Sequence, residues 1–259
     1  MARIFITGSS EGLGMMTGRL LVEQGYEVVL HARNAARAAD AKDALPAADA
    51  VVEGDVATLA GMRQVAEQAN ALRPFDAIIH NVGIGYREPE RIATADGLPH
   101  VFAINVLAPY VLTGLMRRPK RLVYLSSGMH HHVSARFDDL LWEQRRWNGS
   151  TAYAESKLYD TMLAFAIAGI WEDVVSTALE PGWVPTRMGG SGAPDDMDKA
   201  HRTQAWLAAG DDSLALTTGK YFYHQKTMAP NSQARDRTLQ ATLLERCAEL
   251  SGVRLGDQI

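Results

Sequence analysis

The chain has 259 residues, 47% of them hydrophobic and 22% charged, and its formal net charge is −4 at pH 7. These values are typical of a folded globular protein, and they exclude a disordered chain and a strongly basic nucleic-acid-binding protein. The single cysteine, Cys247, excludes an internal disulfide and a thiolate metal cluster, so we expect a reducing compartment, the cytoplasm.

Short apolar runs alternate along the chain with longer segments of helical spacing. The run at the N-terminus is too short for a signal peptide or a membrane helix. The charge of −4 without a long run of Lys or Arg gives no footprint for an anionic membrane surface, so no membrane partner is expected. Apolar residues recur with helical spacing over residues 13–20, where Gly25 is expected to end the helix, and over Leu59–Leu72 and Val101–Met116. The predicted strands are Arg3–Thr7, Val28–His31, Ala50–Glu53, Ala77–His80, Arg121–Leu125 and Val174–Leu179.

Strand–helix alternation predicts an α/β fold with a parallel sheet. The strands are almost wholly apolar, as expected when helices cover both faces. We therefore predict a single-domain Rossmann-type doubly wound parallel sheet over residues 1–259. Two segments lack this alternation, Gly128–Ser150 and Arg187–Pro230. The second is predicted to form a partly helical, substrate-binding lid over the carboxyl edge of the sheet.

A glycine-rich loop, Thr7 to Gly14, follows the first predicted strand and opens the first predicted helix. Free N–H groups and the helix dipole favour a phosphate at such a place, and glycines let the backbone approach it. The spacing Gly-x-x-x-Gly-x-Gly differs from the commonest dinucleotide-binding fingerprint but uses the same physics. A tight turn without a ligand is the alternative interpretation.

Tyr153 and Lys157 lie four residues apart in a strongly helical stretch, so both side chains can reach one site. A neighbouring ammonium favours the phenolate and brings the tyrosine pKa toward the range useful for acid–base chemistry. By itself this pair is more often a surface feature, but the glycine loop strengthens the functional interpretation.

With both motifs present, the sequence resembles the short-chain dehydrogenase/reductase family from Arg3 to about Thr186, and more loosely beyond. The landmarks occur in order along the chain. They are Thr7 to Gly14 for Thr-Gly-x-x-x-Gly-x-Gly, His80-Asn81-Val82-Gly83 for Asn-Asn-Ala-Gly, Ser126-Ser127 for the serine at a strand end, Tyr153 to Lys157 for Tyr-x-x-x-Lys, and Pro181 to Thr186 for Pro-Gly-x-x-x-Thr.

The resemblance implies roles for four residues. Tyr153 would be the general acid in carbonyl reduction, and Ser127 would hold the substrate oxygen. Lys157 would bind the nicotinamide ribose and lower the tyrosine pKa, while Asn105 would position a water that relays protons to Lys157. Spacing does not choose between Ser126 and Ser127, and Ser127 is taken from its position in the motif.

The 25 residues between Ser127 and Tyr153 make a longer connection than the family usually has. Such a connection resembles the retinol dehydrogenase-like subgroup, which carries a histidine-containing segment and an aromatic-Asp-Asp-Leu stretch there. Here these are His130-His131-His132 and Phe137 to Trp142. Adjacent histidines point in different directions and no ligand pattern completes a site, so no metal is expected.

Arg33 follows the second predicted strand, where an NAD site would carry an acidic residue for the ribose hydroxyl. An arginine there suits a 2′-phosphate, so NADP(H) is expected and NAD(H) is the less favoured cofactor. Glu11 weakens this case, because NADP-dependent relatives often carry a basic residue near it.

The resemblance implies further cofactor contacts along the chain. Asp55 and Val56 would bracket the adenine ring, and Thr186 would hold the carboxamide. The full set is Gly8, Ser10, Gly12, Leu13, Gly14, Arg33, Asp55, Val56, Asn81, Gly83, Tyr153, Lys157, Pro181, Gly182, Val184 and Thr186. Glu180 is a departure, because an uncharged residue is expected so close to the nicotinamide.

The sequence thus predicts an NADP(H)-dependent carbonyl reductase or alcohol dehydrogenase. Aromatic residues in the two irregular segments favour a bulky, apolar carbonyl or alcohol substrate. An inactive NADP(H)-binding sensor or scaffold is the alternative, and glycine spacing disfavours a nucleotide-sugar epimerase. The resemblance also implies a homodimer or homotetramer formed through the helices that carry Asn105 and Tyr153.

Overall fold

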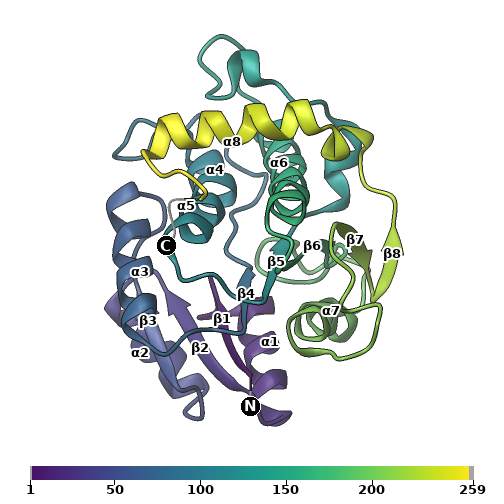
Figure 1. Ribbon diagram of the computed structural model, residues 1–259. Coiled ribbons are helices and arrows are strands. Elements are labelled where there is room, and N and C mark those ends of the chain that lie inside the picture. Colours follow the sequence, from purple (N-terminus) through teal and green to yellow (C-terminus); the bar gives the residue numbers. More distant parts are fainter. Residues whose placement is uncertain (1, 257–259) are drawn as a thin grey trace.

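The protein is organised around one sheet of eight strands in the order β3-β2-β1-β4-β5-β6-β7-β8 (Figure 1). The structure is a computed structural model that describes residues 2–256. The first seven strands are parallel, and β8 pairs antiparallel with β7. The strands are β1 (Arg3–Ile6), β2 (Glu27–Ala32), β3 (Ala50–Glu53), β4 (Ala77–His80), β5 (Arg121–Leu125), β6 (Val175–Glu180), β7 (Lys220–Tyr223) and β8 (Lys226–Met228).

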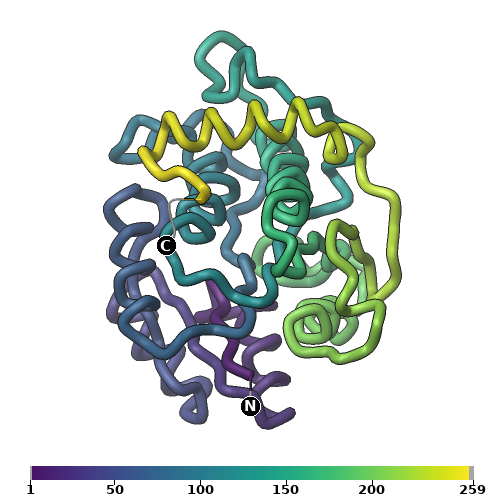
Figure 2. The backbone as a smooth tube through the Cα atoms, in the orientation of Figure 1, coloured from purple at the N-terminus to yellow at the C-terminus, as the bar shows by residue number. Residues whose placement is uncertain are grey.

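Helices cover both faces of this sheet, which confirms the predicted doubly wound fold. One layer consists of α1 (Gly12–Glu23), α2 (Ala35–Ala44) and α7 (Met197–Ala209), and the other of α3 (Leu59–Ala71), α5 (Ala108–Leu115) and α6 (Gly149–Ile170). The C-terminal helix α8 (Arg237–Ser251) packs across α6, as the yellow and green tubes in Figure 2 show. Short elements are α4 (His100–Phe102), η1 (Ala103–Leu107), η2 (Gly128–His132), η3 (Phe137–Asp139) and η4 (Ser232–Arg235).

The strands are buried on both sides. In β1, Ile4 and Ile6 join the core beneath α1 and α7, while Phe5 joins the core beneath α3 and α5. Alternate side chains of a strand point to opposite faces, so a strand covered on both faces must be apolar throughout. Burying each such side chain contributes about 1.5–3 kcal/mol. The result is a rigid platform that fixes the loops at the strand ends.

The segment 187–230, predicted as a lid, contributes largely to this platform. Its helix α7 belongs to the layer with α1, and its strands β7 and β8 extend the sheet. Tyr221 and Phe222 are fully buried on opposite sides of β7. A lid role stays a prediction for the stretch between Thr186 and α7.

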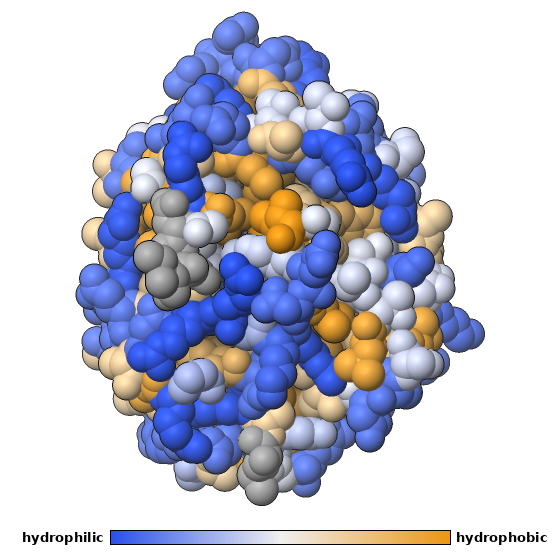
Figure 3. Space-filling view, viewed as in Figure 1, coloured by the Kyte–Doolittle hydropathy of each residue, from blue (hydrophilic) through white to orange (hydrophobic). Residues whose placement is uncertain are grey.

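Among residues 2–256, no helix has the length and hydrophobicity needed to cross a bilayer. The face seen in Figure 3 is mostly polar, but apolar residues reach the surface in the region of α5 and α6. The predicted homodimer or homotetramer through these helices stays a prediction.

Candidate active site

Four neighbouring strands end at one edge of the sheet, and each is followed by a predicted functional segment. β1 leads into the glycine loop, β4 into Asn81, β5 into Ser126 and Ser127, and β6 into Pro181. Parallel strands place their carboxyl ends at the same edge, so segments far apart in sequence meet there. This edge is the candidate active site.

The glycine loop, Thr7 to Gly14, is fixed against the segment that follows β4. The Nδ2 amide of Asn81 donates to two carbonyls of the loop, each at 2.9 Å. Gly8 has a φ of +61°, and a Cβ on Gly14 would lie 2.5 Å from the Asn81 amide, so both positions require glycine. The Glu11 side chain does not cap α1, which leaves first-turn N–H groups for an anion. The half-buried or exposed members of the loop are Gly8, Ser10, Glu11, Gly12 and Leu13.

His31 on β2 holds the glycine loop from the other side, a role the sequence analysis missed. The Gly8 N–H donates to His31 Nδ1 at 2.9 Å, and His31 Nε2 lies 3.0 Å from the Gly54 carbonyl. These partners assign the neutral tautomer with its proton on Nε2. Burial lowers the pKa of His31, which keeps this tautomer at neutral pH. The available signal was a histidine within an otherwise apolar buried strand.

Tyr153 and Lys157 lie on α6, whose first turn is capped by Asn148. Both side chains are buried, and the Lys157 Nζ lies 5.9 Å from the Tyr153 ring centroid. The ammonium donates to the Leu125 carbonyl at 2.7 Å and to Asp160 Oδ2 at 2.8 Å. The structure therefore brings the predicted pair together, and it adds Asp160, which the sequence analysis did not single out.

The phenol of Tyr153 has opposing influences on its pKa. Burial raises the pKa, while the Lys157 charge and a hydrogen bond with Ser127 lower it, and the net shift is upward. Ser126 instead points into α6, where its hydroxyl donates to the Lys157 carbonyl at 2.8 Å. The geometry thus places Ser127, and not Ser126, beside the tyrosine.

Asn105 lies where the predicted continuous helix Val101–Met116 is interrupted by a π-helical turn, η1. Pro109 has no N–H to donate to the Asn105 carbonyl four residues earlier, which accounts for the interruption. The Asn105 side chain accepts from Ile84 N at 2.9 Å and donates to Ser156 Oγ at 3.0 Å. A Cβ on Gly83 would lie 3.5 Å from both Asn105 Oδ1 and Lys157 Nζ, so these groups lie together.

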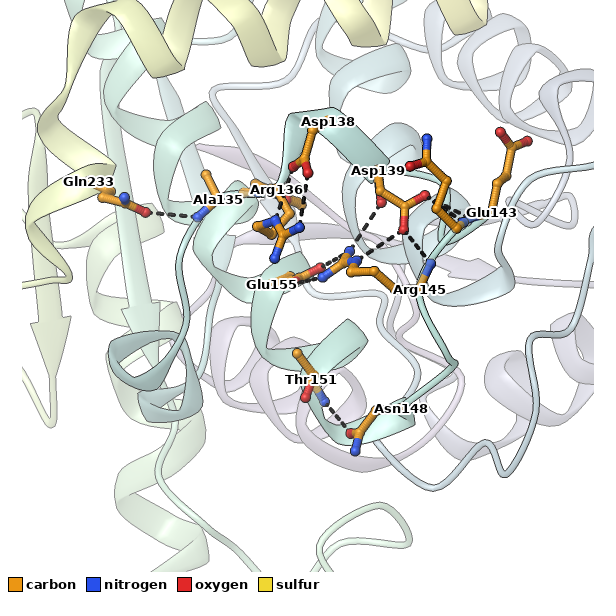
Figure 4. Close-up of polar contacts among 12 residues, drawn as sticks. Ala135, Arg136, Asp138, Asp139, Glu143, Arg145, Asn148, Thr151, Glu155 and Gln233 are labelled. Carbon is orange, nitrogen blue, oxygen red and sulfur yellow. Dashed lines mark hydrogen bonds and ion pairs between the residues drawn. The ribbon is translucent and has the colours of Figure 1, made fainter.

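The connection from Ser127 to Tyr153 is tied to α6 by a buried ion network (Figure 4). The Arg145 guanidinium donates to both carboxylate oxygens of Glu155, at 2.7 and 3.1 Å, and its Nε donates to Asp139 Oδ2 at 3.1 Å. Burial opposes ionisation of Asp139, but backbone N–H donors from residues 143–145 hold its pKa down to about 2. The aromatic-Asp-Asp-Leu stretch thus anchors this connection.

His130 fixes the same connection near Ser127. Its Nδ1 lies 2.7 Å from the Ser127 carbonyl, and its Nε2 accepts the Asn231 N–H at 3.1 Å. Burial lowers the pKa of His130 to about 4, so the ring is neutral at physiological pH. The histidine run therefore contributes a structural hydrogen bond beside the site.

The predicted adenosine end of the site lies around the end of β2. Arg33 is exposed there, and Glu11 binds Arg37 on α2, with Nη1–Oε2 at 3.3 Å. Asp55 is also exposed, whereas the Val56 side chain is buried in the core. Any contact of Val56 with an adenine ring would therefore come from its backbone.

The segment after β6 is folded over the end of the sheet. Val184 is buried, Pro181 and Gly182 are half-buried, and the Thr186 hydroxyl accepts from Gly189 N at 3.1 Å. Burial raises the pKa of Glu180, whose Oε2 would lie 2.5 Å from a Cβ on Gly128. Glu180 therefore lies beside the residue that follows Ser127.

Tyr86 lies against Tyr153, with ring centroids 5.7 Å apart in an edge-to-face arrangement. A Cβ on the neighbouring Gly85 would lie 2.7 Å from Met188 Cγ, so the segments after β4 and β6 touch here. Tyr86 was not among the predicted site residues. Its position just after the Asn81 to Gly83 motif was the available signal.

Comparison with known proteins agrees with this geometry. The family model for short chain dehydrogenase matches residues 2–124. An uncharacterized oxidoreductase of Emericella nidulans is 45% identical over 257 residues, covering 98% of each chain. Retinol dehydrogenase 13 of Homo sapiens is 28% identical over 96% of this chain and 84% of its own length.

Among solved structures, an uncharacterized protein of Mycobacterium paratuberculosis superposes with a TM-score of 0.83. That protein is 23% identical, and the match covers 98% of this chain and 95% of the other. The resemblance found in the sequence, including its retinol dehydrogenase-like relatives, is confirmed. The chain is an oxidoreductase that belongs to the short-chain dehydrogenase family.

Proposed function

We propose that this oxidoreductase interconverts a carbonyl and an alcohol with NADP(H), using Tyr153 as general acid and base. The observation that carries the proposal is a buried phenol placed beside both Lys157 and Ser127, at the edge of the sheet that holds the glycine loop. Tyr153 would give its proton to the carbonyl oxygen, and Ser127 would hold that oxygen. The Lys157 ammonium would stabilise the phenolate that remains after this proton transfer.

The residues present fit a dinucleotide. Gly12 has open space where a Cβ would stand, and α1 begins without a side-chain cap, so the glycine loop can receive a pyrophosphate. Asp55, Asn81, Gly83 and Thr186 occupy the strand ends expected for the rest of the cofactor. When bound, the nicotinamide would supply or accept the hydride.

The substrate proposed is a bulky, apolar carbonyl or alcohol, because the Tyr86 ring packs against Tyr153 and Met188 lies against the neighbouring Gly85. The same proposal includes a cytoplasmic location. The single cysteine, Cys247, is buried and forms no disulfide, which suits a reducing compartment.

A panel of aldehydes, ketones and alcohols tests this function. Each compound is incubated with the purified protein and either NADPH or NADH, and nicotinamide absorbance is followed. We expect turnover of apolar carbonyls with NADPH. Tight NADPH binding without turnover of any compound would instead support the sensor or scaffold.

Arg33→Ala should weaken NADPH binding about 10- to 100-fold and change NADH binding little, because only NADPH offers a phosphate to the guanidinium. Fluorescence titration of both cofactors measures this difference. Arg117→Ala is the matched control, since Arg117 is an exposed arginine outside the site. An equal loss for both cofactors would contradict the NADP(H) assignment.

A further inference from the structure

Asp160 shares the buried space around Lys157 and has no part in the mechanism above. It lies three residues after Lys157 on α6, and its Oδ2 accepts from the ammonium at 2.8 Å. The side chains of Lys157 and Asp160 are only 5% and 3% exposed. Because both charges are removed from water, each depends on the other for its stabilisation.

Lys157 is the cation that balances Asp160 in the described part of the chain. The second carboxylate oxygen, Oδ1, is buried and has no hydrogen-bond partner among residues 2–256. The other titratable groups facing it are Tyr153 on α6 and Tyr124 on β5. Tyr124 and His80 on β4 both bond Thr113 Oγ1, at 2.8 and 3.0 Å, and burial lowers the pKa of His80 to about 3.

This charge arrangement changes what Lys157 does to Tyr153. An isolated ammonium beside a buried phenol would lower the phenol's pKa strongly, but Asp160 opposes that effect. Burial is the largest influence on the pKa of Tyr153 and raises it; Lys157 opposes burial, and Asp160 offsets part of the Lys157 effect, so the net shift is upward. Burial also raises the pKa of Asp160, to about 6, so the carboxylate is largely ionised above neutral pH.

We propose that Asp160 is a positioning residue that offsets the charge of Lys157, so that Tyr153 keeps its proton at neutral pH and the site is set for carbonyl reduction. This inference rests on the proposed function. A reductase needs the phenol as a proton donor, whereas alcohol oxidation needs the phenolate as a base. Asp160 thereby sets the pH at which each direction runs.

Asp160→Asn keeps the size of the side chain and removes its charge. In the pH profiles of carbonyl reduction and of alcohol oxidation, one change in activity should come from the ionisation of Tyr153. We expect the pH of that change to fall by about one unit, which is the order expected for losing one nearby charge. Asp160→Glu keeps the charge and should restore the profile of the unaltered protein. Asp173→Asn, which removes an exposed carboxylate paired with Arg118, is the matched control and should leave the profile unchanged.

A second readout needs neither cofactor nor turnover. The ultraviolet absorbance of tyrosinate is titrated in the apoprotein, and the titration of the same protein with Tyr153→Phe is subtracted. Asp160→Asn should lower the pH at which Tyr153 ionises by about one unit. A folded Asp160→Asn protein with an unshifted titration would overturn the inference.

If Asp160→Asn does not fold, the unaltered protein decides the question. Its tyrosinate titration still tests the inference, because ionisation of Tyr153 below its ordinary pKa of 10.0 would show that Asp160 does not offset Lys157 and would overturn it. Inactivity toward the whole substrate panel would contradict the proposed function alone, because the tyrosinate titration does not depend on activity.

Discussion

Tyr153→Phe should lower kcat about 10²- to 10⁴-fold while NADPH still binds, because the change removes the proton donor and little else. The ring stays in its buried place against Tyr86. Lys157 keeps its bonds to Leu125 and Asp160, so the cofactor side of the site is expected to persist. Steady-state kinetics with a substrate from the panel measures kcat, and fluorescence titration measures NADPH affinity.

A second tyrosine provides the control for this experiment. Tyr26→Phe also removes one hydroxyl, which donates to the Ala209 carbonyl at 3.4 Å; Tyr26 precedes the first residue of β2, away from the carboxyl ends of the strands. Its kcat should stay close to that of the unaltered protein. Retained turnover in Tyr153→Phe would show that another group transfers the proton.

Arg145→Met should lower the free energy of unfolding by about 3 kcal/mol, because it leaves two buried carboxylates without their cation. The side chains of Glu155 and Asp139 are each 4% exposed, whereas Arg145 is 20% exposed. Methionine retains much of the packing volume beside Trp142. The fall in the free energy of unfolding therefore comes mainly from the lost charge and less from lost packing. Urea denaturation followed by circular dichroism measures the change.

Arg136→Met is the matched control in the same connection. Arg136 pairs with Asp138 at 2.9 Å, but both side chains are exposed, so little stability should be lost. Equal stability losses in the two variants would contradict a structural role for the buried network.

Much of the fold could be predicted because its determinants are local. Apolar runs in β1 to β6 show that both faces are covered, and the helices between them dictate parallel pairing. The β7–β8 hairpin was missed in part because β8 is only three residues long and exposed throughout, so it has no apolar run to mark it. The turn uses His224 and Gln225 at positive φ without a glycine to mark it. In addition, the aromatic cluster of β7 is as compatible with a lid over the site as with a buried strand.

The site residues also divide into those that the sequence could predict and those that it could not. Motif residues such as Tyr153 and Ser127 could be placed, since strand ends and helix spacing decide where they lie. His31, Asp160 and Arg145 were missed because each acts through a contact between segments that only the folded chain brings together, or through burial that spacing does not reveal. Tertiary packing is the missing information in all three cases.

The two walls of the site are held with very different strength. One, the connection before α6, is locked by the network around Arg145, while the other, the stretch after Thr186, reaches the glycine loop through an exposed Arg187–Glu11 pair 3.8 Å apart. An exposed pair at that distance adds little stability and is screened by salt. We therefore expect ligand entry and product release to require motion of the Thr186 side, with exchange rates that rise with ionic strength.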